Sequence, residues 1–194
     1  DFVFDCILRN EKVSKIDLIM GESMGGIFAL HYLLSNPIPY SPDVVIFSTP
    51  LKINYLNFID FKNINLVGNF LFSRDKLVVP VKELNKELID DSILWNKINS
   101  DTLVPSHINV NYLLTLKKMI KFINRNYSKL DMNILFIYGE YDAISNSRKI
   151  EKKNAKYDNL KTIVLEDQPH AIFWNTNNNY KNKIGNWLKE NEKQ

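Results

Sequence analysis

Four short apolar runs stand out along the chain, and they predict the strands of one sheet. They occupy residues 16–20, 43–48, 133–138 and 160–165. The second run, DVVIFS, is β-branched and apolar throughout. That pattern is typical of a parallel strand covered on both faces, because such a strand has no solvent side to alternate toward.

Segments with helical character separate these runs. A helix is predicted over 25–34, and it ends before Pro37, which cannot continue a helix. A polar surface helix is predicted over 146–157, and a closing helix begins near 176–180 and is anchored by the apolar residues of 184–188. Residues 1–10 place Val3, Cys6 and Ile7 at helical spacing. Strands alternating with helices predict an α/β fold with a mostly parallel sheet.

Residues 51–130 have a different character. Apolar residues lose their strand-like clustering, and helical faces are predicted within 81–98 and 108–123, with a connector at 104–107. We predict a mainly helical cap inserted into the domain, with a second small domain as the alternative. The predicted division is therefore 1–50 as core, 51–130 as cap and 131–194 as core.

The turn after the first predicted strand carries the candidate chemistry. Residues 21–25 read Gly-Glu-Ser-Met-Gly, between the apolar run 16–20 and the predicted helix. A strand, G-x-S-x-G and a helix in this order form a tight turn that presents a nucleophilic serine. We expect strained backbone angles at Ser23, and glycine at 21 and 25 because a Cβ there would collide with strand or helix. The alternative is a glycine turn that happens to contain a serine.

Ser23 needs a base to take its proton, and the base needs a carboxylate to orient it. Asp142 follows the third predicted strand and His170 follows the fourth, so both belong to the edge where parallel strands end. His31 and His107 compete with His170. Glu140 and Asp167 compete with Asp142, although Asp167 is close to His170 in sequence. An exposed loop aspartate and a helix-capping histidine are the structural alternatives.

Composition narrows the possible functions. The chain has 194 residues, 45% of them hydrophobic, which suffices for one domain with a sizeable core. A net charge of +3, without a run of like charges, argues against nucleic acid as a partner. The single cysteine, Cys6, allows no internal disulfide, which favours a cytoplasmic location. We expect no metal and no cofactor, since no cluster of His, Cys and acids shows ligand spacing.

Three segments, GESMGG, YGEYDAIS and DQPHAIF, resemble the monoacylglycerol lipase and lysophospholipase-like branch of the α/β-hydrolases. The resemblance implies Ser23 as nucleophile, Asp142 as acid, His170 as base and the Met24 N–H as an oxyanion-hole donor. It also implies a cap whose apolar inner face receives an acyl chain, with peripheral contact of the cap with a membrane. The phenylalanines of the cap suggest a lipid-like ester, with the core of the cap as their alternative place: Phe58, Phe61, Phe70 and Phe72. Rival functions are a carboxylesterase for small or xenobiotic esters and a non-catalytic binding protein of this fold.

One feature departs from that family. Its members carry a His-Gly-type loop after an earlier strand, and this loop gives the second oxyanion donor, whereas Asp1 lies only 22 residues before Ser23. We therefore expect these residues to be the C-terminal part of a larger hydrolase domain. The remaining N-terminal portion would pack beside 16–20, which otherwise presents a bare apolar edge.

Overall fold

The computed structural model describes residues 15–36, 41–52, 77–80, 92–105, 107–142, 144–173 and 179–191. The helix predicted over 1–10, the first part of the one predicted over 81–98, and the four cap phenylalanines lie outside the described residues.

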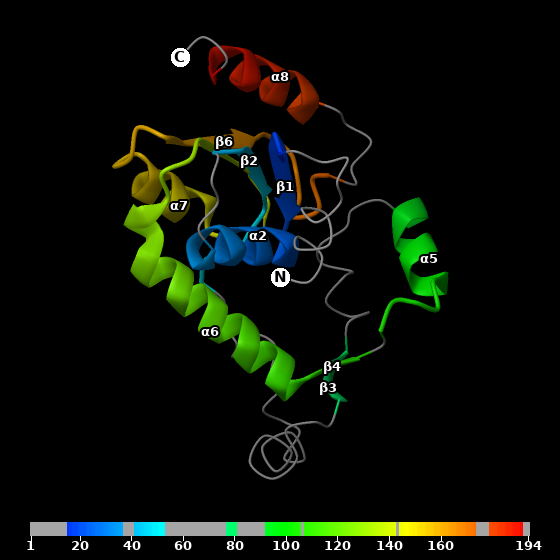
Figure 1. Cartoon of the computed structure of the whole chain (residues 1–194). Helices are drawn as coiled ribbons and strands as arrows, with labels where there is room; N and C mark the ends of the chain where they lie inside the picture. Colours follow the sequence, from blue (N-terminus) through cyan, green and yellow to red (C-terminus); the bar gives the residue numbers. More distant parts are fainter. Residues whose placement is uncertain are drawn as a thin grey trace.

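A four-stranded parallel sheet forms the centre of the fold, as the apolar runs predicted (Figure 1). Its strands are β1 (Leu18–Glu22), β2 (Asp43–Phe47), β5 (Ile134–Gly139) and β6 (Leu160–Leu165), in the order β1-β2-β5-β6. Three strands lie within two residues of their predicted bounds, and β6 matches them. Because all four strands run the same way, their C-terminal turns gather at one edge of the sheet.

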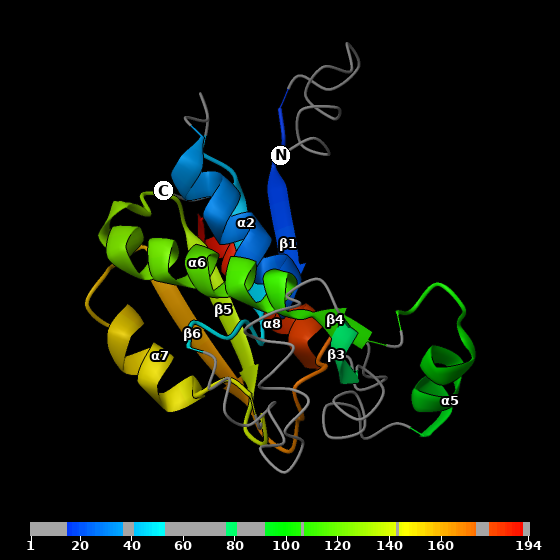
Figure 2. The same ribbon diagram turned by 90° about the horizontal axis from the view of Figure 1, so that it is seen from below.

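Helices cover both faces of this sheet (Figures 1 and 2). On one face lie α2 (Met24–Ser35), α6 (Val110–Asn126) and α7 (Ser147–Asn154), and α8 (Asn179–Asn191) covers the other. A short 3-10 turn, η2 (Tyr127–Lys129), continues α6.

The two central strands show why the runs lack polar alternation. Val44 and Ile46 of β2 point into the core beside α2 and α6, while Val45 and Phe47 point into the core beside α8. The side chains of β5 alternate in the same way, and every residue of both sets is buried. An apolar side chain is therefore favoured at each of these buried positions.

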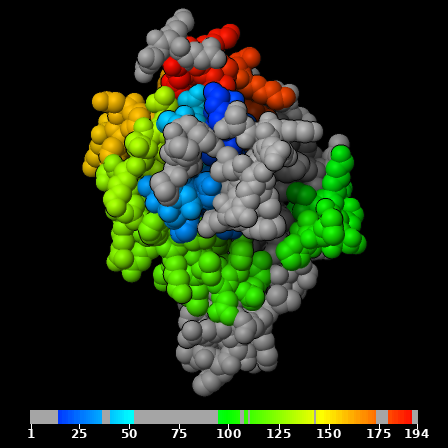
Figure 3. Space-filling model, in the orientation of Figure 1, coloured from blue at the N-terminus to red at the C-terminus, as the bar shows by residue number. Residues whose placement is uncertain are grey.

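Residues 51–130 differ in part from the prediction. Two short strands, β3 (Leu77–Pro80) and β4 (His107–Asn109), pair antiparallel, so the predicted connector at 104–107 ends inside a strand. Helix α5 (Ser92–Ser100) lies at an edge of the molecule (Figure 3). Leu116, Ile120 and Ile123 of α6 join the core beside the sheet. The boundary of a cap at residue 130 stays a prediction.

Within the described residues, no helix combines the length and the apolar character needed to cross a bilayer.

Candidate active site

The turn between β1 and α2 holds Ser23 in a rare backbone conformation. Ser23 has φ 51° and ψ −113°, a region that residues other than glycine seldom adopt. Its N–H donates to the carbonyl of Phe47 at the end of β2, over 2.9 Å. Although Ser23 precedes the helix, its hydroxyl makes no capping bond to α2, so the oxygen is available for chemistry.

Close packing fixes this turn, but not through both expected glycines. A Cβ on Gly21 would lie 2.7 Å from the carbonyl carbon of Gly25, so the expectation for Gly21 is confirmed. The expectation for Gly25 is wrong, because a Cβ there would meet nothing within 4 Å. The second crowded position is Gly26, where a Cβ would overlap the hydroxyl of Thr49. The last glycine of GESMGG therefore packs α2 against the end of β2.

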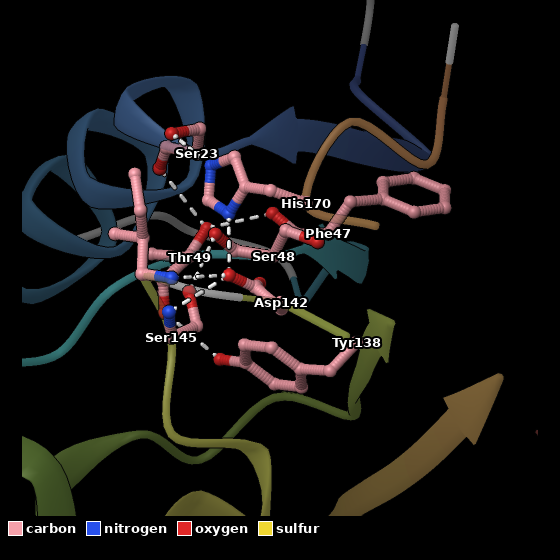
Figure 4. A network of polar contacts seen from close by, with 9 residues as sticks. Ser23, Phe47, Ser48, Thr49, Tyr138, Asp142, Ser145 and His170 are labelled. Carbon is pink, nitrogen blue, oxygen red and sulfur yellow. Dashed lines mark hydrogen bonds and ion pairs between the residues drawn. The ribbon is translucent and has the colours of Figure 1, made fainter. Parts of the chain in front are cut away.

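The structure brings the three predicted site residues together (Figure 4). Nε2 of His170 lies 2.9 Å from Oγ of Ser23, and Nδ1 lies 2.8 Å from Oδ1 of Asp142. The His170 side chain is 3% exposed and the Asp142 side chain is fully buried. Shielding from water strengthens the interaction between carboxylate and ring. A serine, an imidazole and a carboxylate in this sequence of contacts can deprotonate the hydroxyl.

The competing residues occupy other places. Glu140 Oε2 accepts the backbone N–H of Asp167 at 3.4 Å, so these two acids contact each other. His31 lies on α2 beside Ser35 and the ring of Phe122, and burial lowers its pKa. The side chain of His107 is outside the described residues.

Hydrogen bonds hold the Asp142 carboxylate in place. Its Oδ1 accepts the backbone N–H groups of Ile144 (2.9 Å) and Ser145 (2.8 Å) in addition to the bond with His170. Three hydrogen-bond partners on one oxygen fix the orientation of the carboxylate. The hydroxyl of Ser145 donates to the carbonyl of Ser48 at 3.0 Å, which links this loop to the end of β2.

Thr49 is a supporting residue that the sequence reasoning missed. Its hydroxyl lies 3.1 Å from the carbonyl oxygens of both Ser23 and Phe47, and its own carbonyl accepts the Tyr138 hydroxyl at 2.9 Å. Thr49 thereby joins the serine turn to β2 and β5 (Figure 4). The available signal was its place just beyond a buried strand, at the edge where the other site residues gather.

Met24 is the first residue of α2, where backbone N–H groups lack acceptors within the helix and the helix dipole is positive. The Met24 sulfur accepts the hydroxyl of Tyr112 on α6 at 2.8 Å. The first N–H groups of α2 thus follow Ser23 directly along the chain.

Among the described residues, no group of three or more His, Cys, Asp or Glu side chains could hold a metal ion.

The chain matches one family model, and its fold is similar to those of several solved structures. The family model described as serine aminopeptidase, S33, matches residues 3–177. The fold is similar to a monoacylglycerol lipase from Paleococcus ferrophilus, with TM-score 0.73 and 16% identity over 96% of this chain and 72% of that one. It is also similar to a soluble variant of the Saccharomyces cerevisiae monoglyceride lipase, with TM-score 0.71 and 16% identity over 97% of this chain and 66% of that one.

A thermostable carboxyl esterase from Bacillus coagulans gives TM-score 0.63 and 13% identity, over 96% of this chain and 67% of that one. No curated protein matches the sequence. At such identities the structural matches establish the α/β-hydrolase fold alone, and this chain spans roughly two thirds of the lengths of those proteins.

Proposed function

The chain belongs to the serine aminopeptidase S33 family of α/β-hydrolases, and from that premise we propose that it cleaves carboxylic esters through an acyl-enzyme intermediate. The contact of His170 with both Ser23 and Asp142, at 2.9 and 2.8 Å, is the observation that carries the proposal. We assign Ser23 as nucleophile, His170 as base and Asp142 as the acid that orients the base.

In the first step, Oγ of Ser23 attacks the ester carbonyl carbon while Nε2 of His170 takes the hydroxyl proton. The carbonyl oxygen becomes an oxyanion, which the Met24 N–H and the positive end of α2 stabilise. When the tetrahedral intermediate collapses, the C–O bond to the alcohol breaks and His170 returns the proton to the departing oxygen. Water then gives a proton to His170 and attacks the acyl carbon of the acyl-enzyme. When the bond from that carbon to Oγ breaks, His170 returns the proton to Ser23 and the carboxylic acid leaves.

Asp142 keeps the Nδ1 proton facing itself, so that Nε2 presents its lone pair to Ser23. It also stabilises the imidazolium that forms in each step. The bonds from Ile144 and Ser145 to its Oδ1 hold the carboxylate in the orientation that this role needs.

We propose a monoacylglycerol or lysophospholipid as the substrate. Two similar folds are monoacylglycerol lipases, and Met24 and Phe28 on the first turns of α2, the helix that follows the serine, are 42% and 44% exposed. Exposed apolar side chains at that position suit an acyl chain. The carboxyl esterase among the similar folds supports the alternative, a general carboxylesterase for small or xenobiotic esters.

The two substrate classes separate in one experiment. Initial rates on p-nitrophenyl esters with acyl chains from two to sixteen carbons should rise with chain length and then level off. A preference for acetate would replace the lipid substrate by the small-ester alternative. The same acyl groups on p-nitroanilides measure amide cleavage, the reaction that the family description names.

Labelling with a fluorophosphonate tests the nucleophile. The wild-type protein should label, Ser23→Ala should not, and Ser35→Ala, a change farther along the same helix, should label like wild type. Equal labelling of wild type and Ser23→Ala would exclude Ser23 as nucleophile. An unlabelled wild-type protein that still binds a hydrophobic ligand would favour a non-catalytic binding protein.

We further propose that an N-terminal portion of the same domain packs beside β1 and supplies the second oxyanion donor. In support, β1 is an edge strand of the described sheet. The chain also spans only 72% and 66% of the lengths of the two lipases. Losing one such donor lowers the rate by about 10²–10³. A protein that begins about a hundred residues earlier, a typical domain length, should therefore label faster than residues 1–194 alone, and equal rates would contradict this arrangement.

We also propose that the cap makes peripheral contact with a lipid surface. Co-sedimentation with phosphatidylcholine vesicles tests it, and a protein that stays in the supernatant at every lipid concentration would contradict it.

A further inference from the structure

Glu22, the residue between Gly21 and Ser23, has a contact that the triad does not explain. It is the last residue of β1, and its half-buried side chain turns toward the segment that follows His170. Its Oε1 accepts the backbone N–H of Phe173 at 2.8 Å. A side chain next to the nucleophile therefore binds the main chain three residues beyond the base.

This bond completes the attachment of the His170 segment. Before the histidine, the carbonyl of Gln168 accepts the N–H of Tyr141 at 3.0 Å, which ties the segment to the loop that holds Asp142. After the histidine, the N–H of Ile172 donates to the carbonyl of His170 at 3.1 Å, and Ile172 is fully buried. Glu22 supplies the next connection, and it leads back to the strand that ends at Ser23.

Phe173, which donates its N–H to Glu22, is held in place by further contacts. Its ring packs edge-on against Phe47, with centroids 5.8 Å apart, and its carbonyl accepts the hydroxyl of Tyr180 at 3.3 Å. With the N–H bonded to Glu22, both main-chain polar groups of Phe173 are held by side chains from other elements. The path from Phe173 to His170 is only three residues long, so a displacement at one end reaches the other.

The charge of Glu22 is a second contribution. Burial raises the pKa of Glu22, and this is opposed by the Phe173 N–H and by the positive charge that His170 carries when protonated. Among the described residues, the titratable groups that influence this carboxylate or respond to it are His170, Asp142 and Tyr180. Of these, only His170 can become positive, so it is the one group among them whose charge attracts the ionised Glu22.

We propose that Glu22 is a positioning residue, which ties the end of the nucleophile strand to the segment carrying His170 and adds a second carboxylate beside the imidazole. The inference rests on the proposed function, because it gives Glu22 a part in the same proton transfer. Asp142 orients the ring from its Nδ1 side, and Glu22 fixes the main chain from which the ring extends.

Two substitutions separate the two contributions. Glu22→Gln removes the charge but keeps an oxygen that can accept the Phe173 N–H, whereas Glu22→Ala removes both. Glu166→Gln is the matched control, since it removes an equal charge from an exposed side chain four residues before His170. Thermal melts show whether each variant is folded.

The effect of the Glu22 charge is measured by the pH dependence of kcat/KM and, independently of activity, by NMR titration of the His170 imidazole. In Glu22→Gln, we expect the acidic limb and the titration midpoint to move to lower pH by about half a unit to one unit, because protonating the ring is harder without the neighbouring negative charge. Glu166→Gln should move both by less than about 0.2 unit, because exposed charges are screened.

The value of kcat tests the hydrogen bond between Glu22 and Phe173. Glu22→Ala should show the same pH shift and, at the pH optimum, a fall in kcat of about tenfold beyond Glu22→Gln, with KM little changed, because the base is misplaced. Equal shifts in Glu22→Gln and Glu166→Gln, or a folded Glu22→Ala with wild-type kcat, would overturn the proposal. If the wild-type protein cleaves no ester, the proposed function fails, and the NMR midpoints alone still decide whether Glu22 acts on His170.

Discussion

Two turns at the same edge of the sheet hold Ser23 and Asp142, and they do so by different means. The turn after β1 is fixed by contact, since Gly21 and Gly26 have no room for a Cβ and Ser23 has φ 51°. The loop after β5 is fixed by hydrogen bonds, which converge on Oδ1 of Asp142 from Ile144, Ser145 and His170.

The difference suits the roles that we propose for the two residues. The hydroxyl of a nucleophilic serine must face the base and make no bond that only holds the turn together. Close packing of the backbone can position the serine without using its side chain. The proposed acid acts through its side chain, so hydrogen bonds to that side chain position it. Each turn should therefore respond to a different kind of substitution.

The largest effect is expected in the hydrogen-bonded loop. Asp142→Asn keeps the shape of the side chain, but its amide can favour the wrong tautomer of His170. We expect kcat to fall by about 10⁴ in ester hydrolysis, as this change does in other Ser-His-Asp sites. Asp131→Asn, at an exposed aspartate, should stay within about twofold of wild type. A loss below about tenfold would remove Asp142 from the triad.

The packed turn should respond to a single methyl group. Gly26→Ala would push a Cβ into Thr49, and we expect it to lower the free energy of unfolding by about 1–3 kcal/mol. Gly25→Ala meets open space and should be neutral or raise stability by up to about 1 kcal/mol, because alanine favours a helix over glycine. Urea midpoints measure both, and variants that change in the same direction would contradict the packing described.

Thr49→Val tests the link between the two turns. It removes the hydroxyl that lies within 3.1 Å of the Ser23 and Phe47 carbonyls, with little change in shape. We expect a loss of about 1–2 kcal/mol in the free energy of unfolding, since buried carbonyls lose a donor. Thr162→Val, at the hydroxyl on β6 that accepts from Asn154, is the comparison variant for the labelling rate, because β6 lies at the other edge of the described sheet from the serine turn. Only Thr49→Val should lower the rate of fluorophosphonate labelling.

The smallest expected effect concerns stability at Glu22. Its pKa is raised from the usual 4.5 by burial, so the folded state binds the proton more tightly than the unfolded state. Stability from this group is present below 4.5 and is lost as pH rises through the raised pKa. Glu22→Gln has no such loss, so its Tm relative to wild type should rise between pH 4 and pH 8. A relative Tm that falls over this range would contradict the sign.

Steric requirements were visible in the sequence, whereas hydrogen-bonding networks were not. The apolar runs predicted all four strands of the parallel sheet, because strands buried on both faces admit few polar residues. Gly21 and the chain order of Ser23, Asp142 and His170 indicated the site, although the second crowded position proved to be Gly26 and not Gly25. Thr49 and Glu22 were missed because their partners are main-chain groups 26 and 151 positions away, and main-chain groups carry no sequence signal. The pair β3 and β4 was missed because strands of four and three residues are too short for periodicity to show.

The backbone angles of Ser23 have a consequence for how this protein would change if its chemistry were no longer needed. A residue with a Cβ at such angles costs about 1–3 kcal/mol, which glycine would largely relieve. Folding alone would thus favour glycine at position 23. A serine kept there at the expense of stability is a side chain retained for reactivity.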